Sequence, residues 1–174
     1  MPSYSPSTIA RIGDIKDGLF VETGGVEYDV WGEKVNCYPF TVYNRCIIHA
    51  LFAEVTETIA GAVQVVFNYI QDTPSIAVQA LSTTTTSLNA YVPGSRLSYV
   101  PGSVGATAIV SALGAYSWVT TSSATILGVT PLAGVQSVGR IGFLSDTTDA
   151  TDGTLQFGVL YTPLDKGAYI EALL

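Results

Sequence analysis

The sequence predicts an all-β protein: a β-sandwich or jelly roll of about ten short antiparallel strands with an extended N-terminal arm. Three observations predict this class. Apolar and polar residues alternate with a period of two in many short segments. Gly, Pro and Ser separate these segments at intervals of roughly 8 to 12 residues. No segment combines a helical period of apolar residues with a helix cap, so no helix is favoured over a strand.

The chain has 174 residues and a hydrophobic share of 48%, which predicts a globular protein with a single core. Residues 1–17 contain Pro2 and Pro6 and have little periodicity, so we expect an arm there. The sandwich domain is expected over residues 18–174. No basic stretch followed by an apolar run opens the chain, and no apolar run has the length of a membrane helix. These features predict folding in a cytoplasm.

The first strands are expected around a glycine pair. Leu19–Glu22 and Val26–Trp31 flank Gly24-Gly25, a dipeptide typical of β-hairpin turns. In the second half, Val26, Tyr28 and Val30 alternate with acidic residues, which predicts one wet face. A further strand is expected over Tyr38–Asn44.

The segment from Arg45 to Ile59 is predicted to be a strand, although its apolar residues also fit a helical period. β-Branched residues at both ends and the lack of a preceding cap favour the strand. Strict alternation would put Ile47, Leu51 and Val55 on one face and Ile48 and Phe52 on the other. Strands are also expected over Ala62–Ile70, with two apolar faces, and over Ser75–Leu81, with alternating faces.

A short repeat follows, Tyr91–Ser95 and Tyr99–Ser103, and each copy has a Pro-Gly pair typical of a type II turn. A strand is expected between the turns, from Arg96 to Val100. Further short strands are expected over 107–113, 116–121, 125–130 and 136–144.

The C-terminal stretch from Gly153 to Leu174 has the clearest strand pattern. Leu155, Phe157, Val159 and Tyr161 alternate with more polar or smaller residues, so we expect them to form one inward face. Pro163 and the Asp165–Gly167 turn end this strand, and a last strand is expected over Ala168–Leu173.

The charge balance excludes one class of function. The net charge is −7, and the seven basic residues are scattered, so no cluster is available to neutralise phosphates. No nucleic-acid partner and no membrane partner is expected. The sequence also has no P-loop, dinucleotide-binding or zinc-ligand spacing, so neither an enzymatic activity nor a cofactor is predicted.

Few residues could carry chemistry. His49 is the only histidine, and Cys46, three residues away on a strand, would point to the opposite face, so a catalytic pair is not favoured. Cys37 and Cys46 could pair across a hairpin, but two buried free thiols are the preferred interpretation. Glu54 and Glu57 could act as acid and base, although solvated edge carboxylates are favoured.

Asp146, Asp149 and Asp152 form an evenly spaced acidic loop that could offer oxygen ligands to Ca²⁺. Their spacing matches no EF-hand loop. A solvated turn in which each carboxylate bonds nearby backbone amides is therefore preferred, and no metal is predicted.

Charge is nearly absent from Thr73 to Gly139, where Arg96 is the only charged residue. We call this segment the charge-poor stretch. Solvent-facing strands normally carry Lys and Glu, which discourage edge pairing, and the cores of subunit interfaces are depleted of charge. The stretch therefore favours a subunit interface in a homo-oligomer. The alternative is a Ser- and Thr-rich surface that needs no partner.

Two segments resemble a known family. One is Val42–Ile59, a long strand ending in a Val-Thr-x-x-Ile turn. The other is Gly139–Leu174, with an aromatic-x-Pro-Leu-Asp-x-Gly-Ala run from Tyr161 to Ala168. Both resemble small all-β virion proteins of tailed bacteriophages, of the type that decorates or cements a capsid. The resemblance implies a β-sandwich, made in the host cytoplasm and found in the virion. It also implies a homotrimer bound to the major capsid protein, and no enzymatic activity.

The alternative function is the receptor- or carbohydrate-binding head of a phage tail fibre or spike. Flat aromatic rings stack on sugars, and the candidates for such a platform are Tyr91, Tyr99, Tyr116 and Trp118.

Overall fold

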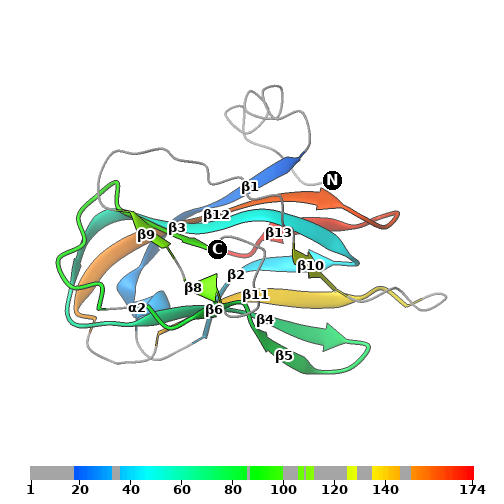
Figure 1. The fold of residues 1–174 in the computed structure, drawn as a ribbon, viewed down its shortest axis with the longest axis horizontal. Coiled ribbons are helices and arrows are strands. Elements are labelled where there is room, and N and C mark those ends of the chain that lie inside the picture. The colour runs from blue at the N-terminus through cyan, green and yellow to red at the C-terminus, as the bar shows by residue number, and fades with distance from the viewer. Residues whose placement is uncertain are drawn as a thin grey trace.

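The computed structural model describes residues 18–32, 36–85, 87–99, 106–107, 109–111, 125–128, 135–145 and 150–174. Two antiparallel sheets pack face to face, and the only helix in these residues is a single turn (Figure 1). The predicted all-β sandwich is thereby confirmed. The predicted arm, residues 1–17, lies outside the described residues. In the described part of the chain, no helix has the length and apolar character needed to cross a membrane.

The first sheet has the order β1-β12-β3-β7-β9, and β10 also pairs with β3. Its strands are β1 (Leu19–Glu27), β12 (Asp152–Pro163), β3 (Cys46–Ala60), β7 (Arg96–Tyr99), β9 (Ile109–Ser111) and β10 (Thr125–Leu127).

The second sheet has the order β13-β2-β11-β4-β5. Its strands are β13 (Tyr169–Ala172), β2 (Asn36–Tyr43), β11 (Val138–Ser145), β4 (Val65–Thr73) and β5 (Ala77–Ala80). Two short strands, β6 (Ser82–Thr83) and β8 (Ala106–Thr107), form a separate parallel pair. Because β1, β2, β3 and β4 belong alternately to the first and second sheets, the chain crosses the core at each of these connections.

The core lies between the sheets and is centred on aromatic rings. The Phe143 ring of β11 meets the rings of Phe67 and Phe157 edge to face, with centroids 5.1 and 5.0 Å apart. Phe143 and Phe67 belong to the second sheet and Phe157 to the first, so the Phe143–Phe157 contact joins the two layers. The predicted inward face of β12 is confirmed, because Leu155, Phe157, Val159 and Tyr161 are all fully buried.

The strand interpretation of residues 45–59 is confirmed by β3, but the predicted faces are wrong at its start. Cys46 and Ile48 point into the core, and so do Leu51, Ala53 and Val55, while Ile47 is only half-buried. The pairing with β12 explains this change of parity. Leu160 lies opposite Ala50 and Tyr161 opposite Ile48, so β3 contains one extra residue there. Such a bulge exchanges the two faces of a strand.

The predicted hairpin at Gly24-Gly25 is also wrong. Residues 19–27 form one strand, β1, and both of its halves pair with β12. Glu22 lies opposite Gly158 and Gly25 opposite Gln156, so the extra residue forms a bulge instead of a turn. The Thr23 hydroxyl accepts a hydrogen bond from the Phe157 amide at 3.0 Å, which holds this bulge in place.

The predicted strand over Val26–Trp31 is wrong after Glu27. Tyr28–Trp31 is the short helix α2, and Trp31 is buried at its end. The Gly32 amide donates to the Tyr28 carbonyl at 2.6 Å and closes the turn. The expected alternation is therefore absent, and Tyr28 is half-buried against the core while Val30 is exposed.

Several other expected elements agree with the structure where it describes them, although the strand expected over 107–113 is divided between β8 and β9. The Val92–Ser95 turn has a bond from the Ser95 amide to the Val92 carbonyl of 3.0 Å, and Gly94 has φ +87°. This is the predicted type II turn. The second turn of the repeat, at 101–103, and the strand expected over 116–121 lie outside the described residues. The predicted alternation of Ser75–Leu81 is wrong, because all four residues of β5 are exposed, whichever face of the strand they lie on.

Candidate interaction surface

The sequence candidates for catalysis are kept apart by the fold. His49 is half-buried, and its Nε2 lies 2.8 Å from the Thr162 hydroxyl oxygen on the neighbouring strand. Cys46 points into the core instead. A polar contact that links β3 and β12 accounts for the histidine.

Cys37 and Cys46 are free thiols, and both are buried. The disulfide alternative is therefore wrong, and the two small buried side chains are confirmed. Burial raises the pKa of each thiol to about 12, because a thiolate would lose its hydration inside the core. The thiols therefore stay protonated and unreactive at neutral pH.

The acidic candidates are not arranged as a reactive pair. Glu54 forms an ion pair with Arg96, and the guanidinium of Arg96 lies over the Phe52 ring, 4.4 Å from its centroid. Glu57 instead lies 2.9 Å from the hydroxyl oxygen of Thr154. Each carboxylate therefore has its own partner. The expected solvated edge position is wrong for Glu54, which is half-buried on β3 between β12 and β7, whereas Glu57 is exposed.

The acidic loop is described only at Asp152, whose Oδ1 accepts a 2.9 Å hydrogen bond from the Gly153 amide. Asp146 and Asp149 lie outside the described residues. Among the residues that the structure describes, no three histidine, cysteine or carboxylate side chains come together as metal ligands.

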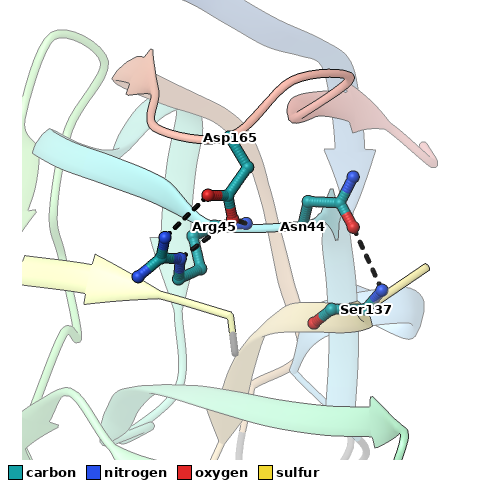
Figure 2. Close-up of polar contacts among 4 residues, drawn as sticks. All are labelled: Asn44, Arg45, Ser137 and Asp165. Atoms are coloured by element: carbon teal, nitrogen blue, oxygen red, sulfur yellow. Dashed lines mark hydrogen bonds and ion pairs between the residues drawn. The ribbon is translucent and has the colours of Figure 1, made fainter. Parts of the chain in front are cut away.

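A polar clamp joins the two corners at which the chain passes between the sheets (Figure 2). Arg45 lies between β2 and β3, and Asp165 between β12 and β13. The Arg45 guanidinium donates to both Asp165 oxygens, at 2.7 and 2.9 Å. Asn44, with φ +58°, accepts a 3.1 Å bond from the Ser137 amide. This network fixes loops far apart in the sequence, so we assign it a structural role.

The clamp predicts a pH dependence of stability. Hydrogen bonds from the Arg45 side chain lower the pKa of the Asp165 carboxyl from its ordinary value. The carboxylate therefore contributes stability above its unfolded-state pKa of about 3.9. This contribution is lost as the pH falls through the lower folded-state pKa. Asp165→Asn should lower the melting temperature at pH 7, and the difference from the wild type should shrink below about pH 3.

The control for this prediction is Asp29→Asn, which makes the same change of charge at an exposed position in α2. Melting curves of the three proteins between pH 7 and pH 2.5 provide the measurement. A deficit of Asp165→Asn that stays constant over this range would contradict the role of the carboxylate.

The aromatic residues proposed for sugar stacking are not exposed where the structure describes them. Tyr99 is buried, because the alternation of β7 turns it inward, and its hydroxyl lies 2.9 Å from that of Thr125. Tyr91 is half-buried against the core. These two rings therefore do not form the predicted platform, and Tyr116 and Trp118 lie outside the described residues.

A different aromatic pair lies on the outer face of the second sheet. The rings of Tyr43 and Tyr169 stack with centroids 4.4 Å apart and planes 18° apart. The Tyr43 hydroxyl donates to Glu171 at 2.9 Å, and this bond raises the pKa of the tyrosine to about 12. The sequence analysis missed this pair, since only the pairing of β13 with β2 brings Tyr169 opposite Tyr43.

The described strands of the charge-poor stretch lie on one lateral side of the sandwich. The stretch contains the strands from β5 to β10. β5 ends the second sheet and β9 ends the first, whereas β1 and β13, which contact each other, end the sheets on the opposite side. Described strands of this segment therefore end both sheets on the same side.

The most exposed part of this side is residues 76–80, which we call the uncharged edge. Ile76 and Val78 are 81% and 68% exposed, the largest values among the exposed large hydrophobic side chains of the described residues. Figure 1 shows β5 at the margin of the molecule, beside β4. Within the described part of the chain, no strand pairs with the other side of β5. The uncharged edge can therefore accept another strand.

Comparisons with protein-family models, with curated proteins and with solved structures find no match to this chain. The fold and the surfaces described above are therefore the basis for a functional proposal.

Proposed function

We propose that this chain is a structural protein of a tailed-bacteriophage virion, a decoration or cement protein that stabilises the capsid shell as a symmetric homo-oligomer and carries out no catalysis. The observation that carries the proposal is the position of the described strands of the charge-poor stretch on one side of the sandwich, with apolar side chains exposed on the uncharged edge. Large apolar side chains in water next to an open strand indicate a surface that another protein covers.

The strand order supports this class of protein. Four neighbouring strands of the first sheet, β1-β12-β3-β7, face four of the second, β2-β11-β4-β5. The strands of these two sets interleave along the chain. We infer that the sandwich is a jelly roll, an architecture that recurs in viral capsid domains and in lectins. Fold alone does not define function, so this support is an analogy.

Electrostatics supports self-association through the charge-poor side. Two copies that each have a net charge of −7 repel each other wherever acidic surfaces meet. Contact through the charge-poor side avoids most of this repulsion. The remaining surfaces would then be available for the major capsid protein. The resemblance noted above implies three copies in each unit.

Two measurements test this proposal. Sedimentation of the purified protein at micromolar concentration should give a stable oligomer, and quantitative mass analysis of purified particles should find hundreds of copies. An 18.3 kDa monomer as the only species would contradict the oligomer. A few copies in each particle would instead indicate a position in the tail.

A second candidate function is the receptor- or carbohydrate-binding head of a tail fibre or spike. The observation that favours it is the stacked Tyr43–Tyr169 pair beside Glu171, which replaces the aromatic platform expected from the sequence. A glycan array should then give binding that Tyr169→Ala removes. Binding that Tyr169→Ala leaves intact would contradict this site.

A further inference from the structure

We propose that β5 pairs with β5 of a second copy of this chain, antiparallel and edge to edge, about a two-fold axis at Val78. The inference rests on the proposed homo-oligomer and names one contact between two copies, which would join units and is distinct from the contact that forms the three-copy unit implied by the resemblance. The two second sheets would then join into one continuous sheet across the axis.

The first argument is the absence of most of the usual edge protection. Proteins protect exposed edge strands by keeping them short, as β5 is with four residues, or with charged side chains, with proline or with a bulge; β5 has none of the last three. β5 has the sequence Ala-Val-Gln-Ala, without charge or proline, and its pairing with β4 is regular from Asn68↔Ala80 to Gln71↔Ala77. An edge of this kind accepts a strand readily, so a protein that stays soluble needs an occupant for it.

The second argument is that the edge is complementary to itself. In an antiparallel pair centred on Val78, Ile76 lies opposite Ala80, Ala77 opposite Gln79, and Val78 opposite its own copy. Ile76, Val78 and Ala80 share one face of the strand, so the apolar side chains of both copies would lie side by side. On the same face, Val78 already lies beside Ile70 of β4, and this apolar row would continue across the axis.

The third argument is electrostatic. It favours contact between two copies through this edge over contact through their acidic surfaces. No charged residue lies between Thr73 and Ser95. The nearest charges in β4 and β11, Asp72 and Arg140, neutralise each other in an ion pair of 2.8 Å. Two copies with a net charge of −7 can therefore approach at this edge with little repulsion.

Cysteine cross-linking tests the contact and its register. The native cysteines are buried, so a thiol introduced at β5 would be the reactive one. Single variants Ala77→Cys, Val78→Cys and Gln79→Cys are oxidised in the full-length protein and separated without reductant. Val78→Cys should give the most two-copy product, because only this position faces itself. Efficient cross-linking of Val30→Cys, an exposed control in α2, together with none at β5, would overturn the proposal.

A charge exchange provides a second test. Val78→Lys and Val78→Glu each bring like charges together at the axis, so each variant alone should dissociate at least tenfold more readily than the wild type. A mixture of the two should recover association, since the charges are then opposite. Because Val78 is 68% exposed in the single chain, both variants should keep the wild-type melting temperature at concentrations low enough for all the proteins to be monomeric. Val30→Lys is the matched control and should associate like the wild type.

The outcomes distinguish this inference from the proposed function. An oligomer of three copies that is unaffected by the Val78 variants would overturn the β5 contact and leave the structural role in place. A wild-type protein that stays monomeric at every concentration would overturn both. Recovery of a two-copy species only in the mixture would support the contact directly.

Discussion

Phe157→Ala is expected to lower the free energy of unfolding by roughly 3 to 5 kcal/mol. Phe157 is fully buried in β12, and its ring meets that of Phe143 from the opposite sheet at 5.0 Å. Removing the ring leaves a cavity between the two layers, which the surrounding strands fill only partly. The loss is large against a typical total of about 5 to 15 kcal/mol. Urea unfolding followed by tryptophan fluorescence measures it.

The neighbouring residue provides the control. Gln156 lies on the outer face of the same strand and donates one 3.0 Å hydrogen bond to the Thr23 carbonyl. Gln156→Ala should therefore lower the free energy of unfolding by about 1 kcal/mol, the net contribution of a single partly exposed hydrogen bond. Equal costs at the two positions would contradict the inward and outward faces that the structure gives to β12.

Trp31→Ala should also lower the free energy of unfolding by roughly 3 to 5 kcal/mol, because it too leaves a cavity in the core. The Trp31 side chain is fully buried, its ring meets that of Phe143 at 6.3 Å, and its Nε1 donates to the Gly153 carbonyl at 3.2 Å. The substitution leaves a cavity and removes the hydrogen bond of a buried carbonyl. Thermal or urea unfolding measures the change.

Val30→Ala, in the same helical turn, is the matched control for this prediction. Val30 is 40% exposed, so truncating it should cost well under 1 kcal/mol. The difference between the two variants measures the burial of Trp31. A small effect at Trp31 would contradict its place in the core.

The predictions from the sequence succeeded where the alternation within a single strand is enough to define its buried face. In β12, one inward face from Leu155 to Tyr161 follows from alternation alone, because that face meets the core along its whole length. The class of the fold, the type II turn at Pro93-Gly94 and the buried free cysteines followed in the same way. Each depends on local geometry or on the composition of a short segment.

The predictions failed where a partner strand sets the local geometry. The faces of β3 change at a bulge that exists only in the pairing of β3 with β12. Gly24-Gly25 forms a bulge for the same reason, since both halves of β1 pair with one strand. A glycine pair permits a turn and a bulge equally well, and the long neighbour decides between them.

The same distinction between local pattern and strand pairing applies to the interaction surfaces. The sequence by itself determined that a long segment lacks charge and that the chain is an all-β protein. Only the tertiary structure decided that described strands of this segment end both sheets on one side, that Ile76 and Val78 are exposed there, and that Arg45 contacts Asp165. The physical reason is that composition and period are local properties, whereas exposure and edge position depend on which distant strands pair.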